Sequence, residues 1–454
     1  MRLNLLAATC VTAYACLAEL QTGSLPPSWI SPAGNCMEDP EWKIHQYNED
    51  LYILRQSGCT HYEKPFLYLI FGKDKALLLD TGAGTPHVAA PVMNLVQKRA
   101  KGKPMELVVT HSHEHRDHTA GDAELAAISG VKVIPAKVDD LKTAFGISEW
   151  PTHVGSIDLG SRVVDVIPIP GHADASITLY DRRTGLLLTG DTVYAGRLYV
   201  GNWEQFAASI RRLVDFTKTR PVTHVLGTHI EQTSTPFKDY VTGTTYQPAE
   251  HTLEMNRGVL LELDEAITAA KGTPTKISLR DVTVVPRSMM QQNAWIPRDF
   301  LAPTLYETAK YKLVPLGPTL AQHDYEAYMS SIDHLRKNYT NGGSWPNKDI
   351  TMADALKDVE GEISRFHART SFTYAVLNAE GTKELGCIYV RPSRKAGYDA
   401  QVTMWVTAER YQAGFDQELF AETKQWIAAN WPFKKVAYPK REISQPDWDA
   451  LPNQ

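Results

Sequence analysis

Short apolar runs separated by polar turns dominate the first half of the chain. Runs of about four to eight residues bounded by turn signals are typical of strands, and they occur at 44–47, 51–55, 66–71, 76–79, 107–110, 131–134, 163–169, 177–180, 186–188 and 223–226. Helical periodicity covers 88–98, 205–217 and 253–270, the last ending before Gly272. Strand pairs mixed with helices predict a layered α/β domain over residues 27–272.

The pattern changes after Gly272. Residues 273–310 are irregular and contain Pro286, Pro297 and Pro303, so we predict a connecting segment. A second, smaller α+β unit follows at 311–450. Its predicted strands are 311–314, 372–377, 384–390, 400–406 and one near Val436, and its predicted helices are 324–337, 352–366 and 417–430.

The N-terminus has the layout of a secretory signal peptide. One positive charge at Arg2 precedes an apolar stretch, and small residues follow near Ala15 and Ala18. We therefore predict cleavage of residues 1–18 and export, to the periplasm or the medium. The alternative is a buried N-terminal helix in a cytoplasmic protein. Cys36 and Cys59 could pair in an exported chain, or they could be two independent thiols.

Composition narrows the class of protein. The chain has 454 residues, of which 43% are hydrophobic and 22% charged, which is ordinary for a globular protein. With a net charge of −5 there is no broad basic field for phosphates, so nucleic acid is excluded as the expected partner. Apart from the N-terminus, no apolar run approaches the ~18–20 residues of a membrane helix, and we expect a small-molecule substrate.

The segment His111-Ser-His113-Glu-His115-Arg-Asp117-His118 carries the strongest chemical signal. It holds four histidines and an aspartate within eight residues, directly after a predicted strand. Neutral imidazoles and carboxylates are the ligands that Zn²⁺ and similar ions prefer. A turn at the strand end can direct His113 and His115 at one metal ion and Asp117 and His118 at a second.

This segment resembles the signature of the metallo-β-lactamase-fold superfamily, His-x-His-x-Asp-His after a strand. Starting that signature at His111 fails, so His111 is interpreted as a supporting residue. Three later positions match the family pattern in order, each after a β-run: His172 in Pro-Gly-His, Asp191 in Thr-Gly-Asp-Thr and His229 in Gly-Thr-His. Asp80 in Leu-Asp-Thr-Gly matches a supporting carboxylate. The resemblance covers about residues 40–270 and implies a four-layer αββα fold.

The resemblance implies a binuclear site with two Zn²⁺ ions, other divalent metals being alternatives. Its metal ligands would be His113, His115 and His172 for one ion, Asp117, His118 and His229 for the other, and Asp191 bridging both. A water between two such ions can reach a pKa near 7 and act as a hydroxide nucleophile. Asp117 would carry the proton to the leaving group.

Asp191 stands where the best-known β-lactamases have a metal-binding cysteine. An aspartate bridge resembles glyoxalase II and lactonases, so we predict hydrolysis of an ester, lactone, thioester or amide carbonyl. Tyr194, three residues later, resembles the lactonase tyrosine that contacts the substrate carbonyl, with core packing as the alternative. The loop 231–251 offers Tyr240, Tyr246 and His251 as substrate contacts, or it is a solvated surface loop.

Four other functions stay open. The same fold also carries β-lactam hydrolases and phosphodiesterases. A single-iron oxygenase would use His113, His172 and an Asp191-like ligand and leave the second site idle. In a binding protein, the C-terminal unit would carry the function instead.

The C-terminal unit loosely resembles the GNAT acetyltransferase fold in its order of elements, notably residues 385–390 and 402–406. That family holds the acyl-CoA pyrophosphate with a glycine-rich turn at a helix start. Here the place reads Glu409-Arg-Tyr-Gln-Ala-Gly414-Phe-Asp416, with one glycine and an acidic residue. We therefore predict a degenerate domain without acyl-CoA binding.

Overall fold

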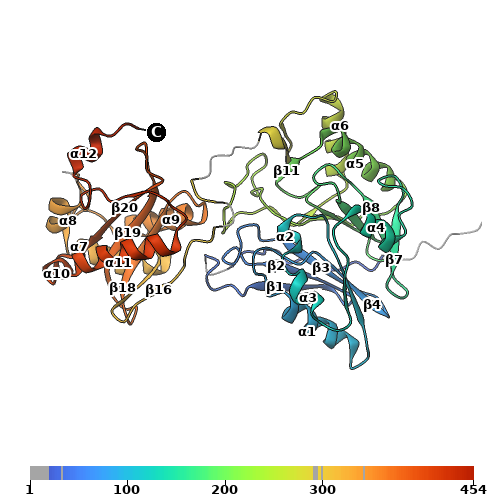
Figure 1. Cartoon of the computed structure of the whole chain (residues 1–454), viewed down its shortest axis with the longest axis horizontal. Coiled ribbons are helices and arrows are strands. Elements are labelled where there is room, and N and C mark those ends of the chain that lie inside the picture. The colour runs from blue at the N-terminus through green and yellow to red at the C-terminus, as the bar shows by residue number, and fades with distance from the viewer. Residues whose placement is uncertain (1–19, 32–33, 290–294, 298–299, 341–342, 454) are drawn as a thin grey trace, which may run out of the picture.

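The computed structural model describes residues 20–31, 34–289, 295–297, 300–340 and 343–453. The predicted signal peptide, residues 1–18, lies outside the described residues. Figure 1 shows two bodies of secondary structure, one from blue to yellow-green and one from orange to red. Among the described residues, no helix combines the length and the apolar character needed to cross a bilayer.

The first body contains two six-stranded sheets. Sheet one runs in chain order: β1 (Trp42–Asn48), β2 (Leu51–Gln56), β3 (Phe66–Phe71), β4 (Lys75–Leu79), β5 (Glu106–Thr110) and β6 (Val131–Val133). Sheet two has the order β13 (Glu254–Met255), β12 (His224–Gly227), β10 (Leu186–Gly190), β9 (Ile177–Asp181), β8 (Val163–Pro168) and β7 (Gly155–Asp158). In sheet one β4, β5 and β6 are parallel, as are β10 and β12 in sheet two, so their carboxyl ends share an edge.

Alternation along the strands divides the buried side chains into layers. Ile53 and Leu77 of sheet one pack with Leu179 and Leu188 of sheet two in a core between the sheets. The side chains that alternate with these along each strand point to the outer face of their sheet. The outer side chains of sheet one pack against α1 (Ala89–Ala100), and those of sheet two pack against α5 (Trp203–Phe216) and α6 (Gly258–Ala269). These four layers confirm the predicted αββα fold (Figure 1).

Shorter elements complete this body. They are α2 (Arg116–Thr119), α3 (Asp122–Ala126), α4 (Val138–Phe145), β11 (Arg197–Val200), β14 (Ile277–Ser278), β15 (Thr283–Pro286) and the 3₁₀ turn η1 (Arg287–Met289). β15 pairs in parallel with β11, and β14 pairs with β15. The structure therefore extends the first body to η1, whereas the sequence pattern placed residues 273–310 in a connecting segment.

Two predicted helices differ from the structure. The helix predicted at 253–270 begins at Gly258, because Glu254 and Met255 pair with β12 at the edge of sheet two. The helix predicted at 324–337 is two helices, α7 (Ala321–Met329) and α8 (Ile332–Asn338). They are separated at Ser330 and Ser331, and the Ser331 hydroxyl accepts a hydrogen bond from the backbone N–H of Ala408. Serine side chains that bond to backbone groups compete with a continuing helix.

The second body is one six-stranded sheet with helices on both faces. Its strands follow chain order: β16 (Tyr306–Glu307), β17 (Tyr311–Pro315), β18 (Phe372–Asn378), β19 (Glu384–Pro392), β20 (Ala400–Val406) and β21 (Val436–Ala437). α11 (Phe415–Asn430) packs on one face, and α7 and α9 (Met352–His367) pack on the other. The turn η2 (Pro318–Leu320) and the helices α10 (Ala408–Gln412) and α12 (Gln445–Ala450) complete it. Its resemblance to the acetyltransferase fold stays a prediction.

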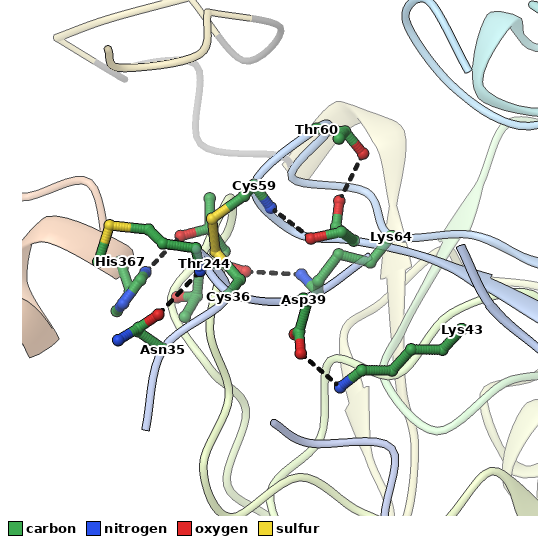
Figure 2. Close-up of a disulfide and its surroundings, with 12 residues drawn as sticks. Asn35, Cys36, Asp39, Lys43, Cys59, Thr60, Lys64, Thr244 and His367 are labelled. Carbon is green, nitrogen blue, oxygen red and sulfur yellow. Dashed lines mark hydrogen bonds and ion pairs between the residues drawn. A yellow bond between two sulfur atoms is a disulfide. The ribbon is translucent and has the colours of Figure 1, made fainter. Parts of the chain in front are cut away.

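The two bodies meet beside a disulfide between Cys36 and Cys59 (Figure 2). This bond decides between the two alternatives that the sequence left open for these cysteines. Nearby, the buried Lys64 ammonium donates to the carbonyl oxygen of Thr244 at 2.6 Å. The next residue, Thr245, donates its backbone N–H to the carbonyl oxygen of His367 in α9 at 2.9 Å. The disulfide-bonded loop thus lies at the contact between the bodies.

Candidate metal centre

Three of the predicted ligands converge at the edge where the parallel strands of the two sheets end. Nε2 of His113 lies 2.8 Å from Nδ1 of His115, and Nε2 of His172 lies 3.1 Å from the same Nδ1. These nitrogens come from the turn after β5 and from the loop between β8 and β9. They form one of the groups in the described chain whose spacing suits a metal ion.

A second group lies beside the first. It contains Asp117, His118, Asp191 and His229, with all ligand atoms within 4.8 Å of one another. Asp117 and His118 lie in α2, whereas Asp191 directly follows β10 and His229 lies two residues after the end of β12. Gly190 has φ +54°, and a Cβ there would lie 2.6 Å from Cβ of Ser112, so only glycine fits immediately before Asp191.

Asp191 faces both groups with different oxygens. Its Oδ2 lies 4.0 Å from Nε2 of His113 and 3.7 Å from Nε2 of His172. Its Oδ1 lies 3.6 Å from Nε2 of His118 and 3.2 Å from Nε2 of His229. One carboxylate is therefore positioned between the two groups, which is the arrangement that a shared ligand requires.

The outer ring nitrogens are anchored, so the inner ones face the cluster. Nδ1 of His118 lies 2.9 Å from Oδ2 of Asp80, Nδ1 of His172 lies 2.7 Å from the Tyr199 carbonyl oxygen, and Nδ1 of His229 lies 2.8 Å from the Glu63 carbonyl oxygen. Hydrogen bonds of this kind fix the orientation of metal-ligating imidazoles. The inner Nε2 atoms of His118 and His229 are buried and face carboxylates: Nε2 of His118 lies 3.2 Å from Asp117, and Nε2 of His229 lies 3.2 Å from Asp191. Buried imidazole nitrogens that converge with two carboxylates are the ligand types that a divalent cation takes, so the donor set fits a metal.

The pKa values of the histidines shift in opposite directions in the two groups. Burial lowers the pKa of His172 to about 4 and that of His113 well below its ordinary value, which keeps both imidazoles neutral as ligands require. Burial also acts to lower the pKa of His118, but the carboxylates of Asp117, Asp80 and Asp191 outweigh it and raise the pKa. The second group therefore attracts positive charge strongly.

His111 lies apart from both groups, as the sequence analysis expected. It is fully buried, with Nε2 2.8 Å from Oδ1 of Asp122 and Nδ1 3.1 Å from the carbonyl oxygen of Ile134. Asp122 also accepts from the Thr81 hydroxyl at 2.9 Å. His111 thus joins β5 to α3 and holds the turn that carries the ligands.

The structure gives Tyr194 a buried position. Its ring meets the ring of His229 edge-on at 5.5 Å, and its hydroxyl donates to the carbonyl oxygen of Arg197 and lies 3.1 Å from Oε2 of Glu231. Burial raises the pKa of this phenol well above 10, so it is neutral. The predicted contact with a substrate carbonyl stays a prediction, and the observed contacts match the packing alternative.

The other candidate contacts, in the loop 231–251, make bonds away from the two metal groups. The Tyr240 hydroxyl accepts from the backbone N–H of Ala249 at 2.6 Å, and the Tyr246 hydroxyl donates to the Ser31 carbonyl oxygen at 3.3 Å. Nε2 of His251 lies 3.4 Å from Asp281. Their contacts are those of a folded surface loop.

Arg287, which no sequence pattern indicated, belongs to the site. It follows β15, and its Nη2 lies 2.9 Å from Nε2 of His115, the ring nitrogen directed away from the other ligands. No carboxylate among the described residues forms an ion pair with it. Nothing in the sequence around Arg287 distinguishes it, because the pairing of β15 with β11 alone brings it to the metal groups.

Comparison with known proteins identifies the domain. The family model described as the metallo-β-lactamase superfamily matches residues 65–238. The chain is 32% identical over 143 residues to a hydroxyacylglutathione hydrolase from Erythrobacter litoralis, covering 30% of this chain and 56% of that protein. It is 32% identical over 144 residues to one from Idiomarina loihiensis, covering 31% and 52%. The chain thus spans about half the length of these curated relatives.

Solved structures give weaker likenesses. A metallo-β-lactamase from Pontibacter korlensis has a TM-score of 0.36 and 16% identity, over 50% of this chain and 99% of its own. An archaeal superfamily protein from Sulfolobus tokodaii has a TM-score of 0.33 and 14% identity, over 51% and 90%. The matched residues 65–238 include both metal groups, which imply a divalent metal. Residues 65–238 of this chain form a domain of the metallo-β-lactamase superfamily.

Proposed function

We propose that the chain is a binuclear zinc hydrolase that acts on an acyl carbonyl, with a thioester or ester as the preferred substrate. The observation that carries the proposal is Asp191, which presents one oxygen to each of two adjacent ligand groups. His113, His115 and His172 would hold one ion, and Asp117, His118 and His229 the other. When bound, such ions lower the pKa of a coordinated water and polarise the attacked carbonyl.

The protein's own groups prepare the site for that chemistry. Asp80 orients His118, and the Thr228 hydroxyl donates to Oδ1 of Asp191 at 2.8 Å, so these two inward-facing ligands keep their positions. Burial acts to raise the pKa of Asp117, but the adjacent His118 and His229 hold it well below its usual range. Asp117 is thus an anionic acceptor that can pass a proton to a leaving group.

The relatives support an acyl substrate. They are named hydroxyacylglutathione hydrolases, which are thioester hydrolases. In this chain Arg287 places a cation, which has no carboxylate partner among the described residues, beside His115 at the side of the cluster. A cation close to a site for divalent cations is unfavourable unless an anion binds between them. We therefore propose that Arg287 binds an anionic group of the substrate.

Metal analysis combined with a hydrolysis panel tests the proposed function. The purified chain should contain about two zinc ions, and a thioester should give a higher kcat/KM than a β-lactam or a phosphodiester. Asp191→Asn should lower metal content and activity together, whereas Asp139→Asn, the same change on exposed α4, should change neither. One ion per chain, or a preference for phosphodiesters, would contradict the proposal.

The rival functions make different predictions for the same experiment. A mononuclear iron oxygenase would bind one iron and leave Asp117, His118 and His229 without a role. That is difficult to reconcile with the Nε2 atoms of the anchored His118 and His229 rings, which face Oδ1 of Asp191 at 3.6 and 3.2 Å. A binding protein that works through its C-terminal unit would show no dependence of function on Asp191.

We also propose that the chain is exported. The disulfide between Cys36 and Cys59 supports this, because such bonds persist in oxidising compartments. Mass spectrometry of the secreted or periplasmic fraction should find a mature N-terminus close to residue 19. An intact residue 1 on the active protein would contradict export by signal cleavage.

A further inference from the structure

The second body contains a large open cavity that the proposed hydrolase site does not use. Its volume is about 590 Å³, within the ~300–1,000 Å³ that is usual for ligand sites. The floor is formed by β19 and β20, and the walls by α9, by the chain around Tyr339 and Trp345, and by the segment that leads into α12. The two metal groups lie in the other body, so this is a separate site.

The cavity exists because part of one sheet face lacks a helix. On β20, Val402 and Met404 point to the face that α11 covers, and they are buried there. Gln401 and Thr403 point to the opposite face and are half buried. They pair across the ladder with Arg391 and Tyr389 of β19, so four polar or aromatic side chains form a continuous floor.

Among the described residues, all the charged groups that line the cavity except Asp358 already make contacts with other protein groups. Arg441 donates to both carboxylate oxygens of Asp416, with Nη2 2.7 Å from Oδ1. The Lys440 ammonium donates to the carbonyl oxygen of Tyr339 at 3.0 Å. Arg391 stacks on Tyr389, 4.6 Å from the ring centre, and lies 4.0 Å from Glu362. An ionic ligand such as a phosphate would have to break these contacts.

Aromatic surfaces and uncharged polar groups remain for a ligand. Trp345, Tyr389, Tyr411 and Trp448 line the cavity, and Tyr411 is 44% exposed. The side chains of Gln401 and Thr403 supply an amide and a hydroxyl on the floor. A purely apolar ligand would leave these two groups desolvated without partners, which is costly.

We propose that this cavity binds a neutral saccharide. A pyranose ring has an apolar C–H face that packs on an aromatic ring, and a rim of hydroxyls that exchange hydrogen bonds with amides and hydroxyls. Both requirements are met on the floor and walls of the cavity, and a neutral sugar needs no unpaired charge. The saccharide would bind to the second body independently of catalysis in the first.

The three tryptophans that line the cavity, Trp345, Trp405 and Trp448, provide the readout. The full chain is titrated with maltotriose, cellotriose and tri-N-acetylchitotriose while tryptophan fluorescence is recorded, and heats of binding are measured by calorimetry. The concentration reaches about 10 mM, above the millimolar Kd of a weak site. At least one of the three should bind and change the fluorescence.

Two variants and a control locate the binding. Gln401→Ala should weaken binding roughly tenfold, because the ligand loses hydrogen bonds to the amide. Thr403→Arg places a long side chain across the floor and should abolish binding. Gln425→Ala, at an exposed position of α11, which packs on the opposite face of the sheet, should leave the affinity unchanged. Gln401→Ala keeps the test valid if Thr403→Arg does not fold.

Three results would overturn the proposal. They are the absence of binding by all three saccharides, equal affinity in Gln401→Ala and the parent chain, and tight binding of acetyl-CoA that Thr403→Arg abolishes. The last result would show that the cavity takes an anionic ligand. Hydrolase activity of the first body should be the same in every variant, so failure of this proposal is distinguishable from failure of the proposed function.

Discussion

Two histidines two residues apart have opposite roles in this structure. His113 points Nε2 at the first metal group, whereas His111 bonds to Asp122 and the Ile134 carbonyl. His113→Ala should therefore lose metal from the first group and most activity. His111→Ala should keep the metal but lower the free energy of unfolding by roughly 1–3 kcal/mol, because its buried partners lose hydrogen bonds. Metal analysis and denaturant unfolding of both variants check this, and equal metal loss in the two would refute the assignment.

Arg287 should affect substrate binding more than chemistry. Arg287→Gln removes the positive charge while keeping a polar side chain, so KM for an anionic thioester should rise about 10-fold or more, the value of a charge-assisted hydrogen bond. KM for a neutral ester should stay the same. Arg280→Gln, a change on an exposed arginine nearby, is the matched control. Equal effects on the charged and neutral substrates would show that Arg287 has a structural role.

At the residue scale, the sequence predicted side-chain donors but not the backbone groups that orient them. Every predicted metal ligand lies in one of the two groups, because each followed a strand end in a recognisable local motif. The carbonyl oxygens of Glu63 and Tyr199, which anchor His229 and His172, leave no trace in residue identity. Arg287 was missed for a related reason, since only tertiary pairing brings it close.

At the element scale, the disulfide fixes a loop that supports the metal centre. Cys59 lies four residues before Glu63, whose carbonyl oxygen anchors His229. The two cysteines are 23 positions apart in the sequence, and closing a loop of this size typically stabilises a protein by about 2–4 kcal/mol. The double variant Cys36→Ser, Cys59→Ser should therefore have a lower Tm in calorimetry. Reductant should lower the Tm of the parent chain but not of the double variant, and no difference between them would contradict this role.

Two buried carboxyl groups, Asp324 of α7 and Glu384 of β19, should make the second body less stable at alkaline pH. Burial raises the pKa of Asp324 to about 7, and burial together with Asp324 raises the pKa of Glu384. Asp358 and Glu362 of α9 add negative charge, and Cys387 is the other titratable group of the cluster. A carboxyl with a raised folded-state pKa stabilises the fold below its unfolded pKa of about 4 and loses this as pH rises through 7.

Unfolding of the second body should consequently require less denaturant at pH 8 than at pH 5. Asp324→Asn keeps the shape without the charge, so it should flatten this dependence. Asp333→Asn, on the exposed side of α8, should leave it unchanged. Denaturant midpoints measured across this range check the prediction, and a stability that rises between pH 5 and pH 8 would contradict it.

Elements with a single strong period were predicted well, and those that depend on a partner were not. The strands from β1 to β5 and helix α5 lie close to their predicted ranges, because a short apolar run between turns, or a helical period, defines each of them by itself. β11, β13, β14 and β15 have two to four residues each and exist only through pairing. Such short strands have no periodicity to detect, and this explains why β14 and β15 were assigned to a connecting segment.

At the scale of the whole molecule, two bodies with separate hydrophobic cores should respond differently to metal removal. The ligands of both metal groups come from segments far apart in the first body, so bound ions stabilise its folded state by mass action, by about 4 kcal/mol at 1,000 times Kd. The second body contains none of these ligands. Calorimetry of the zinc-loaded chain should thus show a chelator-sensitive transition and a chelator-insensitive one. His113→Ala should reduce the chelator effect, and Asp324→Asn should leave it intact. If the chelator shifted both transitions equally, the two bodies would not be independent. If it shifted neither transition, the metal centre itself would be refuted.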